Sequence, residues 1–378
     1  MKSIYLYNPF WSTFGGGEKY TVALAKALSQ IPEIYVTLLS DDTRIQKADL
    51  ERFSQIDLCN INFRIIHSSN ELDQITRSAD AFICLSNFKW VKSAAHRRIQ
   101  LLQIPYGKIN AASIFTKIFK GKLREAAKDP FRLKMLSFSR SEADIVITNS
   151  RFVSDTLAKN FGIESHVLHP PIQDFSLQGF SKKNLILSVG RFFGGLYNDK
   201  RYDVLTEAFR RVSRSDLRGW EYHIVGNAST HSSTEKMLHS LRERNKSYPV
   251  YFHVNCALEL LHQLYNEATI FWHAAGYEVD EDLHPENVEH FGMTTVEAMS
   301  AGCIPVVIKK GGQKEIVLDT VNGFSWSTTD ELIGHSVEIA RGSIPLAEIR
   351  QNARKRFEEF SMERFRQRAV KLFSPVLS

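Results

Sequence analysis

The chain alternates between short runs of apolar residues and longer stretches in which apolar residues recur every three or four positions. The first pattern predicts buried β-strands and the second predicts helices. In the first half, strands are expected at Ser3–Tyr7, Tyr35–Leu39, Ala81–Leu85, Ile99–Ile104 and Asp144–Thr148, with helices at Glu18–Gln30 and Phe152–Asn160. Such alternation implies right-handed crossovers and parallel sheets.

The alternation pauses over Pro170–Lys183, which is rich in Pro, Gly, Ser and Gln and lacks periodicity, as expected of a linker. Beyond it, a helix is predicted at Tyr202–Arg214, with strands at Asn184–Val189, Glu221–Val225, Val250–Val254, Ile270–His273 and Ile304–Ile308. The pattern therefore predicts an α/β protein with two Rossmann-like lobes, residues 1–175 and 183–355. The C-terminal helix at 356–378 is expected to pack back on the first lobe.

Length and composition agree with two globular lobes. The chain has 378 residues, of which 43% are hydrophobic and 24% charged, and a single core rarely grows to that size. None of its four cysteines forms a C-x-x-C pair, so no zinc knuckle or redox motif is indicated. The N-terminus is typical of a first strand rather than a signal peptide. No apolar run reaches the roughly 18–20 residues that span a bilayer, and we expect a cytoplasmic location.

The net charge of +6 lies in the first half: residues 1–175 hold 23 Lys and Arg against 17 Asp and Glu, and the rest holds 25 against 25. Much of the excess falls at Lys108, Lys117, Lys120, Lys122, Arg124, Lys128, Arg132 and Lys134, interleaved with apolar residues. This mixture in residues 108–134 is typical of a surface that contacts anionic lipid at the inner membrane face. A solvated helix with an ordinary buried face is the alternative. No nucleic-acid-binding motif accompanies the charge, and no nucleic-acid partner is expected.

Ligands of parallel sheets bind beyond the carboxyl ends of the strands, so the residues there are the candidates for chemistry. Gly15–Gly17 separate the first strand from the first helix and are suited to an anion at a helix N-terminus. A tight turn is the alternative interpretation. Arg191 follows a buried strand and Lys200 precedes the next helix, so these two cations are predicted to converge on a diphosphate.

The most informative segment joins the strand ending at His273 to a helix through Thr294–Ala301. It contains Glu289, and Glu297 follows eight positions later. Carboxylates at these places suit the hydroxyl groups of a sugar and a ribose, whereas the helix N-terminus suits a phosphate. Two carboxylates alone would repel a diphosphate, so Arg191 and Lys200 are needed as its counter-charge.

The Glu289-to-Glu297 spacing, followed by Ala298-Met299-Ser300-Ala301-Gly302-Cys303-Ile304-Pro305-Val306, resembles the E-x7-E signature of retaining glycosyltransferases of family 4. Val189-Gly190-Arg191, Lys200, Gly15–Gly17 and Asn149-Ser150 are similar to further motifs of that family. The start of the chain and Glu289–Gly292 resemble mannosyltransferases that extend lipid-linked oligosaccharides. The resemblance covers essentially the whole chain.

The resemblance implies a GT-B fold, with the lobes facing across a cleft, and a retaining, metal-independent transfer of a hexose from a nucleoside-diphosphate sugar to a polysaccharide or lipid-linked glycan. GDP-mannose is favoured over UDP-sugars, and no cofactor is expected. Arg191, Lys200 and Glu289 would be catalytic. Donor-binding positions would be Gly16, Gly17, Gly190, His290, Phe291, Gly292, Met293, Thr294 and Glu297. Many relatives carry a first-lobe histidine near Ile99–Tyr106, where this chain has Gln103, so no histidine is assigned to catalysis.

Other functions are less well supported. Asp280-Glu281-Asp282 matches the D-x-D motif of metal-dependent transferases, but its late position in an acidic loop favours a solvated segment. A GT-B-fold epimerase would need its own acid and base residues, and a phosphorylase would need a lysine for pyridoxal phosphate. A non-catalytic sugar-nucleotide-binding protein is the remaining alternative.

Overall fold

The protein was analysed as a computed structural model that describes residues 2–87, 91–119, 121, 123–192, 199–228 and 232–377. The chain divides into two compact units. The first comprises Met1–Pro171 with Met362–Ser378, and the second comprises Ile172–Ser361. The C-terminal segment expected as one helix is split between them: α13 (Leu346–Glu358) belongs to the second unit and α14 (Met362–Leu377) to the first.

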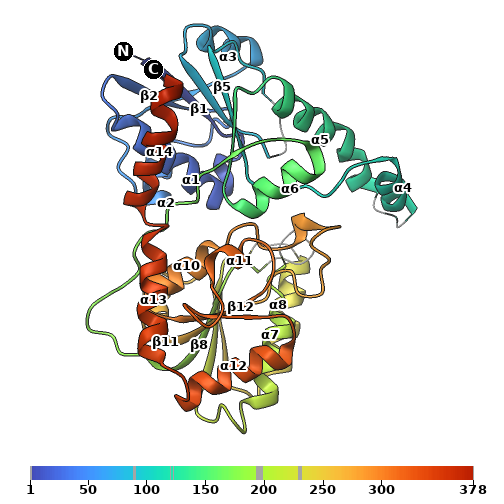
Figure 1. Ribbon diagram of the computed structural model, residues 1–378, viewed down its shortest axis with the longest axis vertical. Coiled ribbons are helices and arrows are strands. Elements are labelled where there is room, and N and C mark those ends of the chain that lie inside the picture. The colour runs from blue at the N-terminus through green and yellow to red at the C-terminus, as the bar shows by residue number, and fades with distance from the viewer. Residues whose placement is uncertain are drawn as a thin grey trace. The chain divides into compact units, whose positions relative to one another are not determined.

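The first unit is built on a seven-stranded sheet with the order β3-β2-β1-β4-β5-β6-β7, in which all registered pairs are parallel. Its strands are β1 (Lys2–Tyr7), β2 (Ile34–Ser40), β3 (Asn62–Ile65), β4 (Ala81–Leu85), β5 (Arg97–Leu102), β6 (Ile145–Thr148) and β7 (His166–Val167). Its helices besides α14 are α1 (Gly16–Ser29), α2 (Lys47–Ser54), α3 (Ser69–Thr76), α4 (Ala111–Phe119), α5 (Leu123–Ser141) and α6 (Arg151–Phe161). Figure 1 draws α4 beyond the end of α5, away from the sheet.

The core of the first unit is closed by the C-terminal helix. Phe365, Ala369 and Phe373 of α14 belong to the same buried cluster as the apolar face of α1 and the central strands. The ring of Phe365 meets that of Tyr20 edge-on, with centroids 5.5 Å apart. Helix α14 thus buries an apolar face that would otherwise be exposed to water, and it stabilises the unit by the hydrophobic effect.

The second unit contains a six-stranded parallel sheet with the order β10-β9-β8-β11-β12-β13. Its strands are β8 (Lys183–Val189), β9 (Glu221–Gly226), β10 (Val250–Val254), β11 (Ala268–His273), β12 (Ile304–Ile308) and β13 (Phe324–Trp326). Besides α13, its helices are α7 (Tyr202–Val212), α8 (Ser232–Asn245), α9 (Leu258–Glu267), α10 (Met293–Ser300), α11 (Gln313–Ile316) and α12 (Thr329–Arg341).

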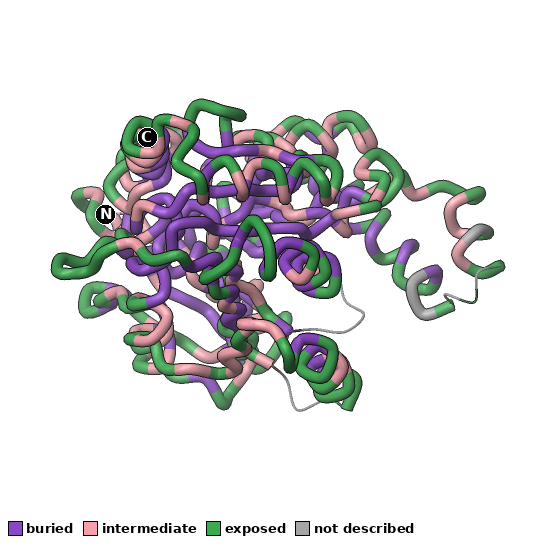
Figure 2. Tube along the Cα trace, turned by 90° about the horizontal axis from the view of Figure 1, so that it is seen from below, coloured by how far each residue is buried: buried purple, intermediate pink, exposed green. Residues whose placement is uncertain are grey.

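The central strands β4, β11 and β12 are buried at every position, and Figure 2 shows buried segments running through the interior of the protein. Strands covered by helices on both faces account for the uninterrupted apolar runs of the sequence. The predicted α/β class with two Rossmann-like units is confirmed. In the second sheet the strand order reverses between β8 and β11, and a crevice forms at such a point beyond the carboxyl ends of the strands.

Candidate active site

The strand-order reversal in the second unit brings Lys200 beside the end of β8. Gly190 follows that strand, and an added Cβ at this glycine would lie 3.0 Å from two side-chain carbons of Lys200. The hydroxyl of Tyr202 donates to the Gly190 carbonyl at 2.8 Å. The lysine side chain therefore packs closely over Gly190, where a larger residue would displace it. Its ammonium lies beside Glu289.

Three side chains meet in front of β8 and β11. The Lys200 ammonium lies 2.5 Å from Oε2 of Glu289, and Nε2 of His273 lies 2.9 Å from the same oxygen. The three side chains are 18%, 14% and 3% exposed, so the contact is largely shielded from water. Oε1 of Glu289 accepts no hydrogen bond from any described residue, which leaves one carboxylate oxygen for a ligand.

The protonation states of this cluster follow from its geometry. Burial would raise the pKa of Glu289, but the charge of Lys200 and the bond from His273 outweigh it and hold the pKa well below the usual carboxyl range. Burial lowers the pKa of His273, so the ring is neutral at neutral pH. Because an ionised carboxylate only accepts, the proton of His273 must be on Nε2. Its Nδ1 is then an acceptor, and this buried atom has no partner among the described residues.

Helix α10 begins next to this cluster. Its N-cap is Gly292, with φ of +119°, a conformation that side chains disfavour. The first backbone N–H groups of a helix have no intrahelical acceptor, so those of Met293 and Thr294 are available to an anion. The loop before this helix is fixed by a hydrogen bond in which the Gly312 N–H donates to the Glu289 carbonyl at 2.8 Å.

Glu297 lies on α10 and has a partner of its own. The Tyr265 hydroxyl donates to its Oε2 at 2.8 Å, and burial raises the pKa of this tyrosine well above its ordinary value, so it stays protonated. The arrangement fixes the direction of the Glu297 carboxylate while leaving its other oxygen unbonded by described residues. Such a positioned carboxylate suits a diol.

The other predicted site residues are placed less closely. Arg191 is exposed at the end of β8, and no described contact joins it to Glu289. Nε2 of His290 lies 3.1 Å from the carbonyl oxygen of Glu286. The ring of Phe291 is buried against that of Phe360. In the first unit, the Glu18 carboxylate accepts from the Gly15 N–H at the start of α1. The turn before Gly16 and Gly17 thus already holds one anionic group.

Sequence reasoning missed His273 and Tyr265 as site residues. His273 is the last residue of a buried parallel strand. Side chains at that end of a strand often face a ligand, so the sequence could have indicated it. Tyr265 could not be recognised from the sequence, because its position fits the periodic spacing of an ordinary buried face of a helix. Among the described residues no three His, Cys, Asp or Glu side chains are grouped to hold a metal. The Glu281 side chain of the D-x-D sequence instead binds Lys314 and the Gly311 N–H.

Comparison with known proteins finds a family model that matches the second unit. Residues 171–356 match the family model for glycosyl transferases group 1. A GDP-Man:Man(3)GlcNAc(2)-PP-Dol alpha-1,2-mannosyltransferase of Dictyostelium discoideum is 25% identical over 239 residues, covering 60% of this chain and 45% of that relative. A mannosylfructose-phosphate synthase of Agrobacterium fabrum is 28% identical over 190 residues, covering 45% of this chain and 38% of the relative. The matched part thus spans less than half of either relative.

Solved structures resemble the whole chain. A glycosyltransferase from Rickettsia africae has a TM-score of 0.73 at 17% identity, with 100% of this chain and 99% of the other covered. Anabaena Alr3699/HepE in complex with UDP has a TM-score of 0.72 at 17% identity, with coverage of 99% and 100%. At this identity the likeness concerns the fold, and it confirms the GT-B class.

Proposed function

Because residues 171–356 match the family model for glycosyl transferases group 1, we propose that this chain transfers a hexose from a nucleoside-diphosphate sugar to a glycan acceptor with retention of configuration. The observation that carries the proposal is the Lys200–Glu289–His273 cluster at the strand-order reversal. It combines a cation for a diphosphate with a free carboxylate oxygen for a sugar hydroxyl. GDP-mannose is the favoured donor, in line with the name of the Dictyostelium relative.

The proposed donor orientation follows from the charges. The diphosphate lies against the Met293 and Thr294 N–H groups at the start of α10, with the Lys200 ammonium and the exposed Arg191 guanidinium as counter-charges. The sugar then faces Oε1 of Glu289, and the ribose faces Glu297. Lys200 must serve both Glu289 and the incoming phosphate, which an ammonium with three N–H donors can do.

The proposed reaction needs no base from the protein. The bond between the anomeric carbon and the diphosphate oxygen breaks while the acceptor oxygen attacks from the same face. The acceptor proton passes to the departing diphosphate. Lys200 and the helix N-terminus stabilise the negative charge that develops on this leaving group, which is where fixed positive groups lower a barrier most effectively.

A donor panel tests this function. The chain should release nucleoside diphosphate from one of GDP-mannose, UDP-glucose, ADP-glucose and dTDP-glucose, with GDP-mannose preferred and with the same rate in EDTA. The rate should be unchanged because the charge that a divalent ion would supply comes from Lys200, Arg191 and backbone N–H groups. Turnover that requires added metal would contradict this mechanism, and no release from any donor would contradict the function.

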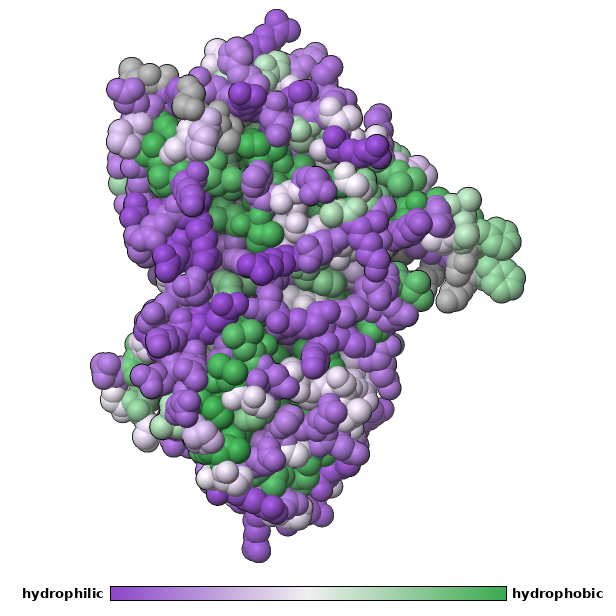
Figure 3. Space-filling model, viewed as in Figure 1, coloured by the Kyte–Doolittle hydropathy of each residue, from purple (hydrophilic) through white to green (hydrophobic). Residues whose placement is uncertain are grey.

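We also propose that α4 and α5 rest on an anionic membrane. Phe115, Ile118, Phe119 and Leu123 are 47–85% exposed, and Figure 3 shows this apolar tip protruding at the place of α4. Of the basic side chains, Lys117 and Arg132 turn to buried Asp129, at 2.7 and 2.9 Å, which weakens the expected field. Exposed cations in the segment include Lys108, Lys128 and Lys134, whereas Lys120 and Lys122 lie outside the described residues.

This contact predicts selective vesicle binding. The chain should sediment with phosphatidylglycerol vesicles at low salt and with phosphatidylcholine vesicles hardly at all. Replacing Phe115 and Phe119 by serine should weaken binding at least tenfold, because each buried phenylalanine contributes roughly 1.5–3 kcal/mol. Phe180→Ser, at an exposed position of the second unit, is the control. Equal sedimentation with both lipids, or of both variants, would contradict the contact. No described helix is long and apolar enough to cross the bilayer.

A further inference from the structure

Two residues with side chains adopt the left-handed backbone conformation beside the candidate active site. Arg201, the N-cap of α7, has φ of +50°, and Glu278, in the loop that joins β11 to Glu289, has φ of +62°. A Cβ atom makes this conformation unfavourable, and glycine is the residue that usually occupies it. Arg201 directly follows Lys200 in the chain. Backbone strain that persists beside a site of chemistry is often part of how the site works.

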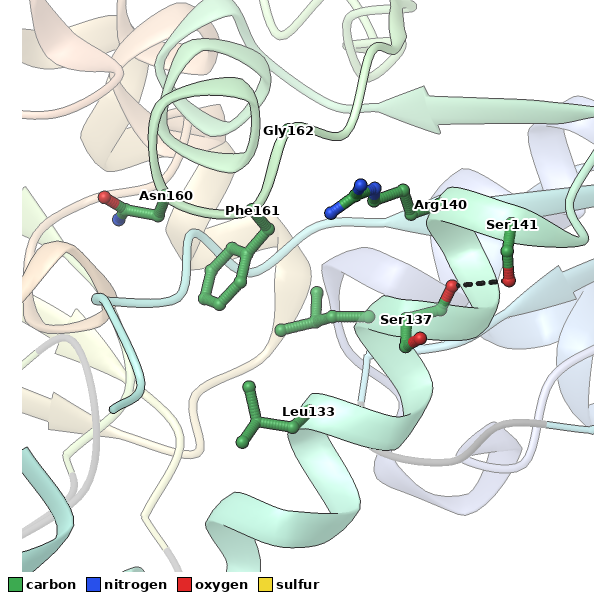
Figure 4. Close-up of a pocket in the computed structure, with 8 residues that line it drawn as sticks. Leu133, Ser137, Arg140, Ser141, Asn160, Phe161 and Gly162 are labelled. Carbon is green, nitrogen blue, oxygen red and sulfur yellow. Dashed lines mark hydrogen bonds between the residues drawn. The ribbon is translucent and has the colours of Figure 1, made fainter. Parts of the chain in front are cut away.

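Glycine does occupy this conformation at other helix ends of the chain. Gly162 follows the last turn of α6 with φ of +62°, and Gly342 follows that of α12 with φ of +64°. Figure 4 shows Gly162 beside Phe161, at the hollow between α5 and the end of α6. An added Cβ at either glycine would meet no atom of the described residues within 4 Å, so the backbone conformation rather than space favours glycine. Arg201 therefore needs contacts of its side chain to hold the same conformation.

The side chain of Arg201 makes such contacts with the loop after β11. Its Nη1 donates to the Tyr277 carbonyl at 2.9 Å, and Oε2 of Glu278 lies 3.3 Å from both Nη1 and Nη2. The guanidinium also lies over the Tyr277 ring, 5.5 Å from its centroid, and that ring packs against buried Trp326. Glu278 is 67% exposed, so its ion pair contributes little. The carbonyl and the ring of Tyr277 are therefore the main anchors.

The turn that carries Arg201 is held within the start of α7 as well. Oδ1 of Asp199 accepts from the Arg201 N–H at 3.0 Å, and Oδ1 of Asp203 lies 3.2 Å from Nε of Arg201. Lys200 lies between Asp199 and Arg201 in this turn. A change of the backbone angles at Arg201 would therefore redirect the lysine side chain.

The loop that anchors Arg201 is itself fixed to the segment that carries Glu289. Gly276, with φ of +96°, packs so closely against Val288 that an added Cβ would lie 2.8 Å from a side-chain carbon of this valine. Val288 immediately precedes Glu289, whose carbonyl has the hydrogen bond described above. The contacts of this loop thus hold Glu289 in place, and Arg201 uses the same loop to set Lys200 against it.

We propose that Arg201 is a positioning residue for the transfer reaction. Its side chain holds an otherwise unfavourable backbone conformation, and that conformation places the Lys200 ammonium beside Glu289. The inference rests on the proposed function of the Lys200–Glu289 pair and adds a residue that acts through Lys200. Charged groups that are fixed before the substrate arrives lower a barrier because they need no reorganisation during the reaction.

Two substitutions separate this role from direct contact with the donor. Arg201→Ala removes the contacts but keeps a Cβ, so the left-handed conformation is lost and kcat/KM with the preferred donor should fall about tenfold. Arg201→Gly removes the same contacts, but glycine adopts that conformation readily, so it should lose less than about threefold. An arginine that bound the donor itself would cause equal losses in the two variants.

A second arginine of α7 provides the control. Arg211 is paired with Asp330 at 2.6 Å and lies within the helix rather than at its N-cap. Arg211→Ala should keep kcat/KM within about twofold of the unaltered chain, because an exposed ion pair contributes little. Thermal unfolding of all three variants shows whether each remains folded.

Hydrogen exchange followed by mass spectrometry tests the same role without reference to turnover. The N–H groups of Val204 and Leu205 donate to the Arg201 carbonyl at 3.1 and 3.2 Å, so they report the conformation at this N-cap. Their exchange should be about fivefold faster or more in Arg201→Ala, because the first turn of the helix opens more easily. It should stay close to that of the unaltered chain in Arg201→Gly and be unchanged in Arg211→Ala.

The outcomes are separable from those of the proposed function. If the unaltered chain turns over no donor, the transferase function fails, while hydrogen exchange still shows whether Arg201 holds the turn. Equal losses of kcat/KM in Arg201→Ala and Arg201→Gly, full activity in Arg201→Ala, or unchanged exchange at Val204 and Leu205 in that variant would each overturn the positioning role.

Discussion

Replacing Glu289 by glutamine should reduce kcat/KM at least a hundredfold while the protein remains folded. The carboxylate is fixed by Lys200 and His273, and its free Oε1 is the proposed acceptor for a donor-sugar hydroxyl. An amide of the same size keeps the shape but removes the charge that orients Lys200. Losing a charged hydrogen bond in a shielded site costs roughly 3 kcal/mol, or about two orders of magnitude in rate.

The same substitution elsewhere in the unit provides the control. Glu267 is also largely buried and is paired with Lys183 at 2.7 Å, at the start of β8 and away from the strand ends that carry the site. Glu267→Gln should therefore retain nearly full activity. Steady-state kinetics with the preferred donor compares the two. If both variants keep the original kcat/KM, Glu289 has no part in the reaction.

Replacing Lys200 by methionine should affect both turnover and stability. The change leaves the Glu289 carboxylate buried with only a neutral histidine as partner. Breaking a buried ion pair in this way costs about 3 kcal/mol of unfolding free energy. Turnover should fall by about three orders of magnitude, because the diphosphate loses its nearest fixed cation. Lys183→Met, at the start of β8 and away from the strand ends that carry the site, should leave turnover nearly unchanged.

The stability loss should depend on pH in a defined direction. In the unaltered chain the pKa of Glu289 is lowered, so its stabilising contribution is present above the ordinary carboxyl range and is lost as the pH falls. Without Lys200, burial dominates and raises that pKa, so the carboxyl group becomes neutral more easily. Urea unfolding should show a smaller difference between Lys200→Met and the unaltered chain near pH ~4.5 than at neutral pH. A difference independent of pH would contradict the charge assignment.

Most of the central strands could be predicted from the sequence because they are covered on both faces. Ala81–Leu85 and Ile304–Ile308 are buried at every position, and each was expected with the bounds observed. Edge strands give a weaker signal. In β3 (Asn62–Ile65), exposed residues alternate with partly exposed ones, and β7 (His166–Val167) has only two residues, so neither shows a sustained apolar run.

The site could be located from the sequence but not assembled from it. The spacing of Glu289 and Glu297 indicates the start of a helix, and Gly190 indicates a close approach. Which side chains meet there depends on which strands are neighbours, and the β8–β11 pairing joins segments about eighty residues apart. His273 could therefore not be assigned to Glu289 from spacing. The ion pairs of Lys117 and Arg132 with Asp129 could not be predicted either, because a count of charges does not show where the side chains point.

Nucleoside diphosphate release from the preferred donor, in buffer containing EDTA, tests the central claim most directly. It is to be measured for the unaltered chain, Glu289→Gln, Lys200→Met and the paired controls Glu267→Gln and Lys183→Met. If the Lys200–Glu289 pair is the donor site, the unaltered chain and both controls should release nucleoside diphosphate. Glu289→Gln and Lys200→Met should release it at less than about 1% of that rate. Comparable release by all five proteins would contradict it.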